Sequence, residues 1–120
     1  MNLDIARAIS AHVMWKAKLL AAIQAGHSEV SADDIRHDDR CELGKWLLSE
    51  ASETLRHSPH YEKSVELHRR FHVVASEVLT CALNGRRHEA MSAIAAQGVF
   101  TEASSALVNE LLAWKKAFSE

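Results

Sequence analysis

The segment between Ser58-Pro59 and Asn84-Gly85 carries the clearest helical pattern in the chain. Its inward-facing positions recur at alternating steps of four and three residues, the spacing of a helix packed in a bundle. Ser58 suits the cap of such a helix, and Pro59 suits its first turn. These inward positions are Tyr61, Val65, His68, His72, Ala75, Leu79 and Ala82. One apolar seam of this length must pack against other helices, which predicts an all-α bundle.

The part of the chain before this helix is predicted to hold one long and one short helix. Residues Leu3–Ala25 repeat at helical spacing with Lys16 as the one misfit, and Gly26 ends the pattern. The following residues 27–40 are polar and rich in aspartate, so they are predicted to be a solvated connecting segment. A short second helix is predicted over Cys41–Thr54. The inward face of the first helix comprises Ile5, Ile9, His12, Leu19 and Ile23.

The last helix is predicted over Arg87–Phe118, with Gly98 bending or loosening it. Only one proline and four glycines occur in the 120 residues, so few other breaks are expected. The whole chain, residues 1–120, is therefore predicted to be a single domain, an antiparallel four-helix bundle with a short second helix. The inward face of the last helix comprises Met91, Ile94, Phe100, Leu107, Leu111, Trp114 and Phe118.

Composition and charge exclude several functional classes. Hydrophobic residues make up 48% of the chain and charged residues 25%, the balance of a globular domain rather than of a disordered one. A net charge of -2 offers no basic excess for nucleic acid. No apolar run approaches the ~18 residues that a membrane span requires, and the first residues lack a signal-peptide pattern. We therefore expect a cytoplasmic protein, in a compartment where thiols stay reduced, with neither nucleic acid nor membrane as a partner. The two cysteines, Cys41 and Cys81, do not form a disulfide framework, and the sequence leaves a single bridge between them open.

Three histidines occupy inward positions where a bundle normally holds leucine. His68 and His72 lie one turn apart on the same helix face, and His12 holds a similar position on the first helix. At a rise of about 1.5 Å per residue, these histidines and Cys41 reach the same height in the predicted bundle. Buried imidazoles without partners cost free energy, because each ring carries a donor and an acceptor. One shared metal ion would satisfy a nitrogen of each ring.

Three imidazoles and one thiolate form a ligand set that suits Zn²⁺ in a tetrahedral site. The start of the predicted second helix also favours the thiolate form of Cys41, because the helix dipole is positive there. Four protein ligands leave no open position for a catalytic water, so no enzymatic activity is expected.

Two catalytic alternatives fit the sequence less well, and a structural one stays open. A metalloprotease helix would need glutamate where Arg69 follows the first histidine. A di-iron bundle would need several inward carboxylates, and Glu62 and Glu66 do not fall on the histidine seam. A purely structural zinc site would have the same sequence as a regulatory one.

Three sequence blocks bear on the kind of protein. They are His12-Val-Met-Trp15, Cys41-Glu-Leu-Gly44-Lys-Trp46-Leu47 and His68-Arg-Arg-Phe-His72. In this order and spacing, they resemble the chemoreceptor zinc-binding domain of bacterial signalling proteins. The resemblance implies that the zinc ligands are His12, Cys41, His68 and His72. It implies packing around the site by Trp15, Leu43, Gly44 and Trp46.

The same resemblance implies how such a domain works. Its relatives look like homodimeric zinc-binding sensors that regulate an attached chemoreceptor or diguanylate cyclase module. In some members, the zinc-bound cysteine is similar to a redox switch oxidised by hypochlorous acid, a role that would fall to Cys41. Because the 120 residues contain no output module, the chain is expected to be either an excised domain or a stand-alone member. Neither Cys81 nor the remaining histidines are assigned a role; those histidines are His27, His37, His57, His60 and His88.

Overall fold

The computed structural model describes residues 2–28, 31–37, 41–47 and 56–119, and all regular structure in these ranges is helical. The prediction of an all-α fold is therefore confirmed. None of the helices in the described part of the chain combines the length and the apolar character that a membrane crossing requires. The helices are α1 (Asn2–Val13), α2 (Trp15–Ala25), α3 (Ala32–Arg36), α4 (Glu42–Lys45), α6 (Pro59–Leu83), α7 (Arg87–Ile94) and α8 (Val99–Ser119).

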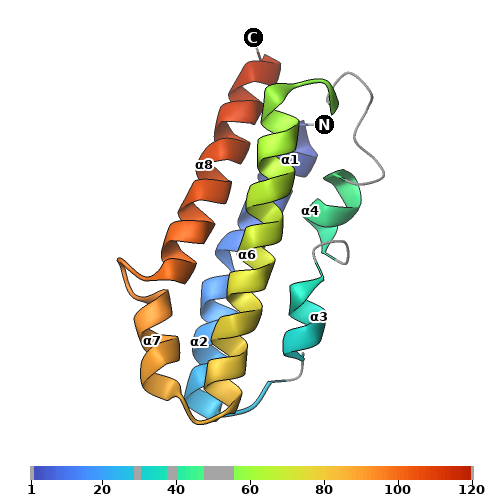
Figure 1. Cartoon of the computed structure of the whole chain (residues 1–120). Helices are drawn as coiled ribbons and strands as arrows, with labels where there is room; N and C mark the ends of the chain where they lie inside the picture. The colour runs from blue at the N-terminus through green and yellow to red at the C-terminus, as the bar shows by residue number, and fades with distance from the viewer. Residues whose placement is uncertain (1, 29–30, 38–40, 48–55, 120) are drawn as a thin grey trace.

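The helices form a bundle whose successive members alternate in direction (Figure 1). The α1–α2 pair runs from the end that holds both termini to the opposite end, and α3 and α4 lie along the return path. The long helix α6 then runs away from the termini, and α7 and α8 lead back to them. In the structure, α3 and α4 occupy the position that was predicted for the short second helix.

Helix α6 lies at the centre of the bundle and begins as predicted. The Ser58 side chain accepts a hydrogen bond from the His60 backbone N–H at 3.2 Å, and Pro59 occupies the first turn. The helix packs against α8, α3, α7 and α2, so its buried surface is wider than a single seam. Phe71 and Val78, which lie beside the predicted seam, are buried as well.

The predicted first helix is divided into α1 and α2 at Met14. The backbone there keeps helical dihedral angles, with φ −69° and ψ −17°. The hydrogen bonds on both sides are long, at 3.3 Å from Met14 N–H to the Ser10 carbonyl and from Lys18 N–H to the Met14 carbonyl. The loosened turn falls next to Lys16, which is exposed and interrupts the inward face. α1 and α2 therefore run in the same direction, but they are two separate helices.

The connecting segment predicted over residues 27–40 contains a helix, so this part of the prediction was wrong. The Ser31 hydroxyl caps α3 by accepting a hydrogen bond from the Asp34 backbone N–H at 3.1 Å. Ile35 anchors the helix because its side chain is buried while Asp33 and Asp34 remain exposed. A single apolar residue among acids carries too little periodicity to predict a five-residue helix.

The second helix begins where it was predicted, since Cys41 immediately precedes α4. The Lys45 N–H donates to the Cys41 carbonyl at 3.0 Å, which closes the first turn. A wider helical turn follows at residues 46–47. The rest of the predicted element, residues 48–54, lies outside the described residues.

The predicted last helix is divided into α7 and α8 by a break at residues 95–98. At Gly98, an added Cβ would lie 2.1 Å from the Ala93 carbonyl oxygen, so only glycine permits this close approach. The Thr101 hydroxyl lies 3.1 Å from the Ile94 carbonyl and 2.8 Å from the Ala95 carbonyl. It therefore satisfies backbone acceptors that the end of α7 leaves without helical partners.

The break also shifts which side of α7 faces inward. Met91 was predicted to be inward, but it is 40% exposed, and Ala90 is buried instead. The error arose because the prediction treated residues 87–118 as one helix. The inward spacing of α8 was therefore continued into α7 without allowing for the break. The predicted inward residues that are buried here are Ile94, Phe100, Leu107, Leu111 and Trp114. The side chain of Phe118 lies outside the described part of the chain.

We predict that Gly98→Ala destabilises the domain by about 1–3 kcal/mol, because the new methyl group forces the backbone at the break apart. Urea denaturation followed by circular dichroism measures this loss. The matched control is Gln97→Ala, an exposed neighbour in the same turn, which is expected to change stability by less than about 0.5 kcal/mol. Equal stability of the two variants would contradict the structural account of the break.

Candidate metal centre

The structure brings together four side chains that are far apart in the sequence. His12 lies in the last turn of α1, Cys41 precedes α4, and His68 and His72 lie one turn apart in the middle of α6. Each offers one ligand atom, and these atoms all lie within 4.8 Å of one another. The three imidazoles are at most 2% exposed, whereas Cys41 is half-buried. In the described part of the chain, they form a cluster that could hold a metal ion.

The distances within the cluster match a single tetrahedral site. The Cys41 Sγ lies 3.1 Å from His68 Nε2, 3.5 Å from His72 Nε2 and 4.0 Å from His12 Nε2. With a Zn–S bond of about 2.3 Å and Zn–N bonds of about 2.0–2.1 Å, a tetrahedral zinc ion would hold sulfur and nitrogen about 3.6 Å apart. The donor atoms also have the softness that zinc prefers over calcium or magnesium. The residues present therefore fit Zn²⁺.

Two hydrogen bonds orient the candidate ligands. The His72 Nδ1–H donates to the Ile35 carbonyl of α3 at 2.7 Å, which leaves the Nε2 lone pair facing the cluster. The Gly44 backbone N–H donates to the Cys41 sulfur at 3.3 Å. A donor directed at sulfur favours the thiolate over the thiol, and the thiolate is the form that binds metal. The local fold thus supports the protonation states that a metal site requires.

Electrostatics also keeps the central imidazole neutral. Burial, together with the neighbouring His72 and His12, lowers the pKa of His68 to about 2. A neutral imidazole has a free lone pair on one nitrogen, whereas a protonated ring has none. At neutral pH, His68 is therefore ready to bind a cation.

The structure places the predicted packing residues in different surroundings. The half-buried ring of Trp15 lies 6.5 Å from the ring of His72, so Trp15 flanks the cluster. Leu43 and Gly44, two and three residues after Cys41, are buried. Trp46 is buried against Trp114 of α8, with ring centroids 5.4 Å apart. It therefore joins the α4 segment to the bundle core.

Two residues that support the cluster were missed from the sequence. The Phe71 ring packs 5.0 Å from the ring of His12, and its position between the two histidines of α6 was the available signal. Ile35 contributes its backbone carbonyl, which no side-chain pattern reveals. The available sequence sign is that Ile35 is an apolar residue between two pairs of aspartates.

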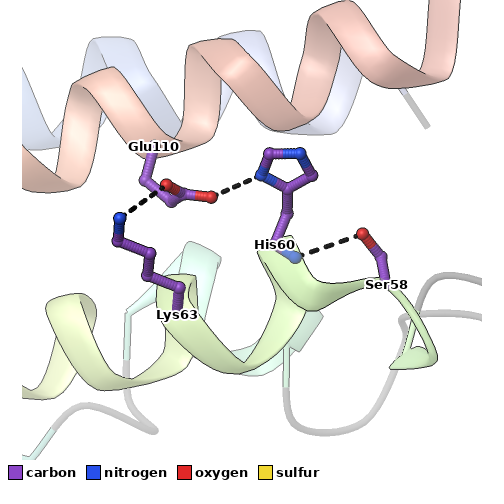
Figure 2. A network of polar contacts seen from close by, with 4 residues as sticks. All are labelled: Ser58, His60, Lys63 and Glu110. Atoms are coloured by element: carbon purple, nitrogen blue, oxygen red, sulfur yellow. Dashed lines mark hydrogen bonds and ion pairs between the residues drawn. The ribbon is translucent and has the colours of Figure 1, made fainter.

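The other cysteine and histidines lie away from this cluster. His27, His37, His57 and His88 are exposed, and the Cys81 thiol lies near Glu89 at 3.7 Å. Figure 2 shows His60 of α6 pointing toward Glu110 of α8, with Nδ1 and Oε2 2.5 Å apart, while Lys63 approaches the second carboxylate oxygen at 3.6 Å. This network joins α6 to α8 and contains one histidine only.

One comparison with known proteins matches the region that contains the cluster. Residues 12–79 match the family model described as the chemoreceptor zinc-binding domain. The match begins at the first clustered histidine, includes the other three residues and covers more than half of the chain. No curated protein and no solved structure shows significant similarity to the chain.

We predict that the chain, purified without added metal, contains about one zinc ion per chain. Replacing Cys41 by serine removes the only sulfur of the cluster, so Cys41→Ser should lose most of its zinc during dialysis against a chelator. Elemental analysis measures the metal content. Cys81→Ser is the matched control, because it removes the other thiol and leaves the cluster intact. Equal zinc retention by the two variants, or bound iron in place of zinc, would contradict this prediction.

Proposed function

Because the chain belongs to the chemoreceptor zinc-binding domain family, we propose that it is a zinc-binding regulatory module whose ligands are His12, Cys41, His68 and His72. This assignment rests on the clustering of four potential ligand atoms, which all lie within 4.8 Å of one another. A bound zinc ion would supply a positive charge that all four ligands bind at once. The contribution of the protein is that these four ligands come from three separate parts of the bundle.

The proposed ligands connect three parts of the bundle. His12 holds the end of α1, Cys41 holds the start of α4, and His68 and His72 hold the middle of α6. His72 also binds α3 through the Ile35 carbonyl. If the ligands are released, three imidazoles remain in an apolar interior at a cost in free energy, so the helices are expected to repack. This repacking is the proposed signal.

Cys41 is the proposed point of entry for an oxidant. It is half-buried, whereas the three imidazoles are almost fully covered. Its thiolate can attack hypochlorous acid: the sulfur acquires the hydroxyl oxygen, and chloride leaves with the electron pair. The resulting sulfenic acid is a weaker ligand than the thiolate. Oxidation would therefore free the α4 segment, and loss of the shared ion would loosen the contact between His72 and α3.

The cellular setting of the domain is also part of the proposal. We propose that the domain is cytoplasmic and that it forms a homodimer. We further propose that it regulates a chemoreceptor or a diguanylate cyclase and does not catalyse a reaction itself. The family description supports the chemoreceptor setting. A closed set of four ligands supports a regulatory role over a catalytic one, since no position remains for substrate or water.

We predict that one equivalent of hypochlorous acid releases zinc from the wild-type chain and from Cys81→Ser alike. A chromogenic zinc indicator measures the release, and hydrogen exchange is expected to increase in α3 and α4. Reduction with a thiol should reverse both changes, because sulfenic acid is reducible. Zinc release that requires Cys81 would exclude Cys41 as the redox switch. Release without any change in hydrogen exchange would contradict the proposed repacking of the helices.

We also predict that the chain has twice the mass of one protomer in solution. Light scattering coupled to size-exclusion chromatography measures this mass across a concentration series. A single-chain mass at all concentrations, with zinc bound, would contradict the proposed homodimer.

A further inference from the structure

A groove of about 470 Å³ lies between α2 and α3, beside the histidine cluster. Its size falls within the range of small-molecule sites in proteins. The apolar walls come from three helices. They are formed by Trp15, Leu19 and Ala22 of α2, Ile35 of α3 and Leu79 of α6.

The groove follows from the way in which α3 replaces a full-length helix. α3 has five residues and packs mainly against α6, so the space between it and α2 is only partly filled. On the α2 side, Ala21, Ala22 and Ala25 present methyl groups where longer side chains would close the gap. Between Lys18 and the end of α2, the opening extends over about two helical turns, or about 11 Å. The shape suits one elongated apolar group.

The charge at the groove points to an anionic head on that group. The Lys18 ammonium lies 4.8 Å from the centre of the Trp15 ring, so its position is defined by a cation–π contact. His27 lies at the far end of the groove, and none of the described residues that line it is acidic. We propose that this groove binds a free amphipathic carboxylate of the fatty-acid type, with the chain on the apolar walls and the carboxylate beside Lys18.

The walls of the groove also contact the candidate metal centre. The Ile35 side chain lines the groove, while the Ile35 carbonyl accepts the hydrogen bond from His72. Trp15 lies on the groove and flanks the His72 ring at 6.5 Å. A carboxylate that shifts α3 therefore changes the orientation of a proposed zinc ligand. This coupling rests on the proposed function, whereas binding in the groove does not.

Decanoate is the probe for the binding step, used with the zinc-loaded chain below the concentration at which decanoate forms micelles. The chain has three tryptophans, and only Trp15 lines the groove. Nuclear magnetic resonance resolves their indole N–H signals, and Trp15→Phe identifies the relevant one. We expect saturable binding that shifts the Trp15 signal and leaves those of Trp46 and Trp114 in place. No saturable shift, or equal shifts of all three signals, would overturn the proposal.

Two pairs of variants test the place and the charge of the site. Ala21→Trp fills the groove from its exposed rim and should abolish binding, whereas Ala17→Trp, on an exposed part of α2 outside the groove, should leave it unchanged. Lys18→Gln should weaken decanoate about two- to fivefold, the range for a partly exposed ion pair, and Lys16→Gln should not. Equal effects within either pair would overturn the assignment, as would equally tight binding of decyltrimethylammonium.

The coupling is tested by measuring zinc affinity with a competing chelator in the presence and absence of decanoate. A change in zinc affinity that disappears in Ala21→Trp supports coupling, because linkage between two sites is reciprocal. An unchanged zinc affinity despite saturable decanoate binding overturns the coupling alone. Failure of the proposed zinc function is recognised separately, since the chain would then bind no zinc in either condition. Binding to phosphatidylglycerol vesicles without binding of decanoate would assign the groove to a membrane surface and overturn the proposal.

Discussion

The burial of three imidazoles beside one thiol is the constraint on which this domain depends. His12, His68 and His72 occupy positions that leucine would fill at lower cost in a bundle of this kind. Their nitrogens converge on the Cys41 sulfur, and the neutral state of His68 suits metal binding better than proton binding. The interior of the bundle therefore contains a polar centre at positions where apolar side chains would otherwise pack. A metal ion bound at such a centre would couple the arrangement of the helices to a ligand, as the proposed regulatory role requires.

The supporting structure around the centre explains why the short segment between α2 and α6 is not an ordinary loop. α3 is held by the buried Ile35 side chain and by the hydrogen bond from His72. α4 begins at Cys41 and is attached to the core through Trp46 and Trp114. Both short helices thus depend on residues of the cluster or on their immediate neighbours. They are the parts of the bundle that we expect to respond first when the centre changes.

Periodicity predicted the long helices well and the breaks poorly. Helix α6 was predictable because Ser58 and Pro59 mark its start and a regular seam extends along it. The divisions at Met14 and at residues 95–98 were harder to predict. At Met14 the backbone stays helical and the inward face continues, whereas the break at residues 95–98 changes which side of α7 faces inward. Gly98 signalled a bend, but the exposure of Met91 depends on how far α7 turns at that bend. The five residues of α3 are too few for any periodic signal. The clustering of the four candidate ligands was easier to predict, because the inward histidines of two helices and Cys41 were placed at one height. The Ile35 carbonyl and the His60–Glu110 pair become visible only when distant segments meet.

X-ray absorption at the zinc edge of the purified chain tests the four-ligand site most directly, because it counts the atoms that bind the metal. We expect one sulfur at about 2.3 Å and three imidazole nitrogens at about 2.0–2.1 Å. A zinc shell without sulfur, or with oxygen in place of a nitrogen, would contradict the assignment of His12, Cys41, His68 and His72 as one closed site.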